Sequence, residues 1–238
     1  MASLVYRECP AQGDPRGLLV LHHGRGTDEL DLLGLADVLD PERRLHVVTP
    51  RGPLTLPGSP GYHWYLVPRV GYPDPQTFAA AYRALGELHD ELWRRTGLGP
   101  ERTVLGGFSM GAVMSYALGL GADRPAPAAI LAFSGFMPNL ESWRPELARR
   151  PSPAVFITHG RSDPVISVEF AREAERRLRE AGIAVAYHES GGGHQIEPAQ
   201  LSLAREWLSA RLGGVPGGPA AAQGSGREQP RAAEPRRA

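Results

Sequence analysis

Short apolar runs alternate with longer amphipathic segments over the first 212 residues of the chain. Seven runs have the length and composition of β-strands. They cover Ser3–Arg7, Gly17–His22, Leu45–Thr49, Thr103–Gly106, Ala128–Phe133, Ala154–Thr158 and Ala184–Glu189. Several of them are continuously apolar, which is typical of strands that are buried on both faces of a parallel sheet.

Five amphipathic segments between these runs are predicted to be helices. They cover Asp28–Leu39, Pro75–Arg95, a segment that begins at Ser109, Val168–Ala181 and Pro198–Leu212. Gly97 and Gly182 follow two of them, at a position where glycine often ends a helix. The alternation of strands and helices predicts an open, mostly parallel α/β sheet.

The end of the chain has a different composition. Residues 213–238 consist almost entirely of Gly, Pro, Ala, Ser, Gln, Arg and Glu, with Val215 as the sole large apolar residue. Such a segment cannot bury enough apolar surface to offset its conformational entropy. We therefore expect one catalytic or binding domain over residues 1–212 and a disordered tail over 213–238.

The charge set excludes several classes of function. All 26 basic residues are arginine and 26 residues are acidic, so the formal net charge is zero. Without lysine there is no Schiff base, no Ser-Lys dyad and no phosphate-loop lysine. The neutral balance also argues against a nucleic-acid partner.

The sequence indicates a soluble protein of a reducing compartment. Cys9 is the one cysteine, so no internal disulfide can form, and the first 17 residues contain no apolar run of the signal-peptide kind. No apolar stretch reaches the ~18 residues that a membrane helix needs. We expect a cytoplasmic location and no stable membrane insertion.

The most specific motif is Gly107-Phe108-Ser109-Met110-Gly111, which follows a predicted strand and opens a predicted helix. A serine in this context is the nucleophile of a strand–turn–helix elbow, which aims the Met110 N–H at a developing negative charge. The alternative is a glycine-rich turn whose serine only caps the helix.

A serine nucleophile needs a base and an acid, which follow it in this order of chain elements. Of the later histidines, His188 lies within a strand and His159 ends one, whereas His194 follows three glycines in a loop. We predict His194 as the general base. Asp163 lies just past a strand, at the sheet edge where active sites form, and is the predicted acid; the alternative is a turn or capping aspartate.

Together with these motifs, two further segments carry a resemblance to a known family. They are His23–Gly26, followed by Asp28, Glu29 and Asp31, and Gly61–Tyr65. Over residues 17–212 the chain resembles the phospholipase/carboxylesterase family of α/β-hydrolases, relatives of the acyl-protein thioesterases. The expected fold is an α/β-hydrolase without a large cap domain.

The resemblance implies a carboxylic ester hydrolase that needs no cofactor and that could extend to thioesters or lysophospholipids. Ser109, Asp163 and His194 would be nucleophile, acid and base, and the backbone N–H groups of Arg25 and Met110 would form the oxyanion hole. Relatives often carry glutamine where this chain has Met110. That difference leaves the backbone donor intact and bears on substrate preference.

Aromatic and apolar residues in two long loops are predicted to form the walls of the site, although they could equally serve to pack the loops. They are Trp64, Tyr65, Phe136 and Met137. We expect a small-molecule ester as partner and no metal, and a homodimer stays open. Two other readings also stay open: an acyltransferase or perhydrolase with the same acyl-enzyme, and a non-catalytic α/β-hydrolase-like binding protein.

Overall fold

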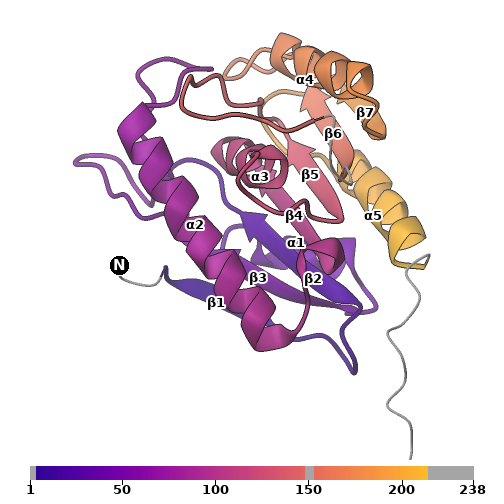
Figure 1. Ribbon diagram of the computed structural model, residues 1–238. Helices are drawn as coiled ribbons and strands as arrows, with labels where there is room; N and C mark the ends of the chain where they lie inside the picture. Colours follow the sequence, from indigo (N-terminus) through magenta and orange to yellow (C-terminus); the bar gives the residue numbers. More distant parts are fainter. Residues whose placement is uncertain (1–3, 148–152, 214–238) are drawn as a thin grey trace, which may run out of the picture.

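Seven strands form one sheet within residues 4–147 and 153–213, the parts of the chain that the computed structural model describes (Figure 1). The order across the sheet is β1-β3-β2-β4-β5-β6-β7; β1 pairs antiparallel with β3, and all other neighbouring strands are parallel. The strands are β1 (Tyr6–Cys9), β2 (Gly17–His22), β3 (Leu45–Pro50), β4 (Thr103–Phe108), β5 (Ala129–Phe133), β6 (Ala154–Gly160) and β7 (Val185–Ser190).

Helices cover both faces of this sheet (Figure 1). They are α1 (Leu33–Leu39), α2 (Pro75–Thr96), α3 (Met110–Leu120), α4 (Glu169–Glu180) and α5 (Pro198–Gly213), with a short 3₁₀ turn at Pro100–Arg102. The buried side chains of α2, α3 and α4 belong to one core layer, and those of α1 and α5 belong to the other. The predicted mostly parallel α/β sheet is confirmed.

Strand β2 shows why the apolar runs are continuous. Leu18 and Val20 pack into the layer beneath α2–α4, whereas Leu19 and Leu21 pack into the layer beneath α1 and α5. Side chains alternate between the two faces of a strand, so a strand covered by helices on both sides needs an apolar residue at every position. All four side chains are at most 1% exposed.

The two largest differences from the predicted boundaries lie at the starts of α1 and β1. Helix α1 begins at Leu33 rather than Asp28, because the Asp28 carboxylate accepts a hydrogen bond from the Leu30 N–H at 2.9 Å and holds this segment in a turn. The first strand begins at Tyr6 rather than Ser3, and Ser3 lies outside the described residues. The expected tail over 213–238 lies almost wholly outside them as well.

The two predicted helix ends are confirmed. Gly97 adopts the left-handed conformation with φ 69°, and its N–H donates to the Trp93 carbonyl. Gly182 has φ 79° and lies just after Ala181, the cap residue of α4, where its N–H donates to the Arg179 carbonyl at 2.9 Å. Within residues 4–147 and 153–213, no helix combines the length and the hydropathy required to cross a bilayer.

Candidate active site

Ser109 lies on a strained turn between β4 and α3. Its backbone has φ 55° and ψ −118°, a left-handed conformation that is unfavourable for a residue with a side chain. The positions two residues before and after Ser109 must be glycine for steric reasons. A Cβ on Gly107 would overlap the Gly111 backbone, and a Cβ on Gly111 would overlap the carbonyl of His22 in β2. The turn holds the serine at the carboxyl edge of the sheet.

Three polar side chains meet at this edge, from loops that follow β4, β6 and β7. His194 Nε2 lies 2.8 Å from Ser109 Oγ, and His194 Nδ1 lies 2.7 Å from Asp163 Oδ2. Both are hydrogen-bond distances, so one ring links a hydroxyl to a carboxylate. The structure therefore brings together the three residues that the sequence places in nucleophile, base and acid positions.

The environment of Asp163 keeps its carboxylate ionised. Burial by itself raises the pKa of this group, but Oδ1 accepts hydrogen bonds from the backbone N–H groups of Ile166 and Val165, each at 2.8 Å. Together with the His194 ring, these donors bring the pKa of Asp163 below its ordinary value. An ionised, fixed carboxylate can hold one tautomer of His194 and stabilise its imidazolium form.

His159 packs against the same carboxylate, a contact that sequence reasoning did not foresee. Its Nε2 lies 2.8 Å from the carbonyl oxygen of Ile166 and 3.3 Å from Asp163 Oδ2. Because a carbonyl can only accept, Nε2 must carry the hydrogen. Burial lowers the pKa of this fully enclosed ring, which favours the neutral form of His159.

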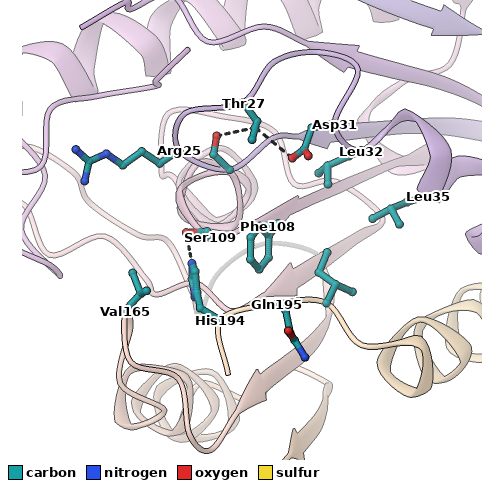
Figure 2. A pocket seen from close by; sticks show the side chains of 12 residues that line it. Arg25, Thr27, Asp31, Leu32, Leu35, Phe108, Ser109, Val165, His194 and Gln195 are labelled. Carbon is teal, nitrogen blue, oxygen red and sulfur yellow. Dashed lines mark hydrogen bonds between the residues drawn. The ribbon is translucent and has the colours of Figure 1, made fainter. Parts of the chain in front are cut away.

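The loop after β2 approaches the serine from the opposite side, and its conformation is fixed just after Arg25. The Gly26 N–H donates to the Tyr62 carbonyl at 2.9 Å, and the Tyr62 N–H donates to the Thr27 carbonyl at 2.7 Å. Figure 2 shows the Arg25 side chain extending away from the Ser109–His194 pair. Met110, on the other side of Ser109, is the first residue of α3, so its N–H has no intrahelical acceptor.

A buried ion pair supports this loop from below. The Glu29 carboxylate is 1% exposed and accepts two hydrogen bonds from the Arg51 guanidinium, at 2.5 and 2.6 Å. These bonds lower the pKa of Glu29 below its ordinary value, against the opposing effect of burial. The sequence offered Glu29 as part of a motif but gave no sign of its partner, which follows a different strand.

A cavity of about 530 Å³ opens beside Ser109 and His194 (Figure 2). Its apolar wall comes mainly from the loop before α1, the end of β4 and the loop after His194. The lining side chains include Leu32, Leu35, Phe108, Val165 and Ile196, with Arg25, Thr27, Asp31 and Gln195 as polar members. Within the described ranges, no group of three or more His, Cys, Asp or Glu side chains is arranged to hold a metal.

The four residues that were predicted as walls do not line this cavity. Trp64, Tyr65, Phe136 and Met137 are between 0% and 7% exposed and belong to the core layer beneath α2–α4. They pack the long loops onto the sheet, which was the alternative considered for them. The residues that do line it, such as Leu32 and Leu35, could be recognised in the sequence only as the apolar side of a helix.

The parallel sheet, the elbow and the Ser-His-Asp array at its carboxyl edge define an α/β-hydrolase. Residues 8–212 match the phospholipase/carboxylesterase family, and the chain belongs to that family.

Known proteins with similar sequences and structures agree with this assignment. The chain is 30% identical over 196 residues to MhqD of Bacillus subtilis (strain 168), covering 82% of this chain and 94% of that protein. The Bacillus cereus carboxylesterase superposes with a TM-score of 0.78 at 26% identity, covering 88% and 95% of the two chains. Esterase PE8 superposes with a TM-score of 0.75 at 33% identity, covering 88% and 99%.

Proposed function

We propose that this chain is a serine esterase that cleaves carboxylic esters through an acyl-enzyme, with Ser109 as nucleophile, His194 as general base and Asp163 as the acid that orients it. The observation that carries the proposal is the continuous hydrogen-bonded array from Asp163 through His194 to Ser109. An array of this kind overcomes the low nucleophilicity of a serine hydroxyl at neutral pH.

In the first step, Ser109 Oγ forms a bond to the carbonyl carbon of the ester while His194 Nε2 takes the hydroxyl proton. The carbonyl oxygen becomes an oxyanion, to which the N–H groups of Arg25 and Met110 donate hydrogen bonds. When the tetrahedral intermediate collapses, the bond to the alcohol oxygen breaks and His194 returns the proton to the leaving alcohol.

In the second step, water takes the place of the alcohol. His194 removes a proton from the water as its oxygen attacks the acyl carbon, and a second oxyanion forms in the same hole. Its collapse breaks the bond to Ser109 Oγ, which regains its proton from His194. The products are a carboxylic acid and the free enzyme, so the cycle requires no cofactor.

The cavity beside the serine favours substrates with a compact apolar group. Its walls are Leu32, Leu35, Phe108 and Ile196, and its volume of about 530 Å³ suits a short to medium acyl chain or a small aromatic ring. The residues that line it include one of each charge, Arg25 and Asp31, so the lining favours neither sign of substrate charge. Oxygen esters and thioesters with such groups are the expected substrates.

A panel of p-nitrophenyl esters and matching thioesters of increasing acyl length tests the proposal. We expect the highest kcat/KM at short to medium length and a loss of at least about 10³-fold in Ser109→Ala. Labelling with a fluorophosphonate probe should likewise disappear in that variant.

Ser134→Ala is a matched control, because Ser134 is also buried, follows a central strand and has a positive φ of 51°. It should keep both turnover and labelling. Full activity of Ser109→Ala would overturn the assignment, and wild-type protein that neither turns over the panel nor reacts with the probe would favour a binding role.

A further inference from the structure

The two proposed oxyanion donors belong to segments that are distant in sequence. The Arg25 N–H lies in the loop after β2, and the Met110 N–H lies at the first residue of α3. Donors of this kind act only when both lie about 2.7–3.1 Å from the oxyanion. Something must therefore fix the Arg25 loop relative to the start of α3.

Trp64 contacts both segments. Its backbone N–H donates to the Sδ atom of Met110 at 3.3 Å, and its indole Nε1–H donates to the carbonyl oxygen of His23 at 2.9 Å. The indole also lies against the His23 ring, with 4.9 Å between the ring centroids. Trp64 is fully buried, so these contacts do not compete with water.

The bond to His23 completes the support of the Arg25 peptide. Gly26, on one side of Arg25, donates to the Tyr62 carbonyl, and His23, two residues before Arg25, accepts from Trp64. Residues 62–64 therefore hold the loop on both sides of the donor. We propose that Trp64 is a positioning residue that joins the two halves of the oxyanion hole, an inference that rests on the proposed esterase function.

This role differs from core packing, because it depends on the indole N–H of Trp64. Trp64→Phe keeps an aromatic ring in the core but removes the indole N–H, which leaves the His23 carbonyl without its donor. The Arg25 peptide can then rotate out of the geometry that binds an oxyanion. The ground-state ester makes little use of this geometry, whereas the tetrahedral intermediate depends on it.

The test compares binding of the ground state with binding of an oxyanion. An alkyl trifluoromethyl ketone adds reversibly to a serine and places an oxyanion in the hole, so its Ki reports on the donors. For Trp64→Phe we expect Ki to rise and kcat to fall by about tenfold, with KM for p-nitrophenyl butyrate within about twofold of wild type. Trp64→Phe with Ki and kcat within twofold of wild type would overturn the proposal.

Trp143→Phe is the matched control. Trp143 is 8% exposed and its indole also donates to a backbone carbonyl, that of Ala117 at 3.1 Å, but in the last turn of α3, at the opposite end of the helix from Met110. It should leave Ki and kcat nearly unchanged. An equal rise of Ki in both variants would show a general packing effect and would also overturn the proposal.

A second variant keeps the test valid if Trp64→Phe fails to fold. Met110→Leu keeps the side-chain volume and the backbone N–H but removes the sulfur acceptor of the other bond, so Ki should rise more than KM. An unchanged Ki would then count against the proposal. Ser109→Ala separates the two hypotheses: an active Ser109→Ala protein refutes the esterase mechanism, whereas an inactive one beside a normal Trp64→Phe protein refutes only the role of Trp64.

Discussion

His159 Nε2 lies 3.3 Å from Asp163 Oδ2, the same carboxylate oxygen that lies 2.7 Å from His194 Nδ1. The His159 ring also donates to the Ile166 carbonyl, and the Ile166 N–H in turn donates to Asp163 Oδ1. Asp163 is therefore held by a small closed network, in which the backbone of one residue, Ile166, connects His159 to the carboxylate.

Removal of the His159 donor should impair the orientation of Asp163. In His159→Leu the buried Ile166 carbonyl loses its partner, and the loop that places two N–H groups on Asp163 can relax. We expect kcat to fall by about tenfold with KM within about twofold, measured on p-nitrophenyl butyrate over a range of pH.

The control for this prediction is His159→Gln, whose side-chain amide nitrogen is the same number of bonds from Cα as the histidine Nε2. It should retain most of the activity because it can donate to Ile166. Equal losses in the glutamine and leucine variants would show that ring packing, rather than the hydrogen bond, is what matters.

The elbow glycines should not tolerate even one added methyl group. A Cβ on Gly111 would overlap the His22 carbonyl, which belongs to a central strand and cannot move aside. We expect Gly111→Ala to lower the free energy of unfolding by more than about 3 kcal/mol, measured by urea denaturation. Gly34→Ala is the control: Gly34 lies in α1 with no atom within 4 Å of an added Cβ, so this change should raise stability by about 0.5 kcal/mol.

Local sequence patterns were sufficient for the sheet and for the polar array. A strand buried on both faces must be apolar at every position, as Leu18–Leu21 are, and the elbow requires glycine at fixed spacing around Ser109. Asp163 and His194 were predicted from their order after Ser109 and from their places in loops that follow strands, because the carboxyl ends of parallel strands share one edge. The strands, the elbow and the loop positions of the polar residues are thus set by local sequence and by the order of the strands, both of which can be recognised without a structure.

The walls of the site depend on long-range packing, which local patterns do not encode. Trp64 and Phe136 were interpreted as wall residues because they are large aromatic residues in long loops, but those loops fold inward and bury them. Leu32 and Leu35 line the cavity instead, since the turn at Asp28 shortens α1 and places its first apolar residues beside the site. The partner of Glu29 was hidden for the same reason, because Arg51 follows a different strand.

The ion pair of Glu29 and Arg51 provides a prediction on stability and pH. Two short hydrogen bonds from Arg51 lower the pKa of Glu29, whose carboxylate is almost fully enclosed. Because the folded-state pKa lies below that of the unfolded chain, Glu29 contributes stability above its unfolded pKa of about 4.3. This contribution is lost as the pH falls through the folded-state value.

We therefore expect Glu29→Gln to lower Tm by about 5 °C at pH 7, and the difference from wild type to shrink as the pH falls below about 4. Asp37→Asn is the control, because it breaks an ion pair with Arg43 whose side chains are 65% and 55% exposed, and should change Tm by less than about 2 °C. Thermal unfolding of the three proteins between pH 3 and pH 7 measures both effects. An equal Tm for Glu29→Gln and wild type at pH 7, or a Tm difference that stays constant down to pH 3, would contradict this prediction. Either result would show that the Glu29–Arg51 pair does not stabilise the loop that contains Arg25.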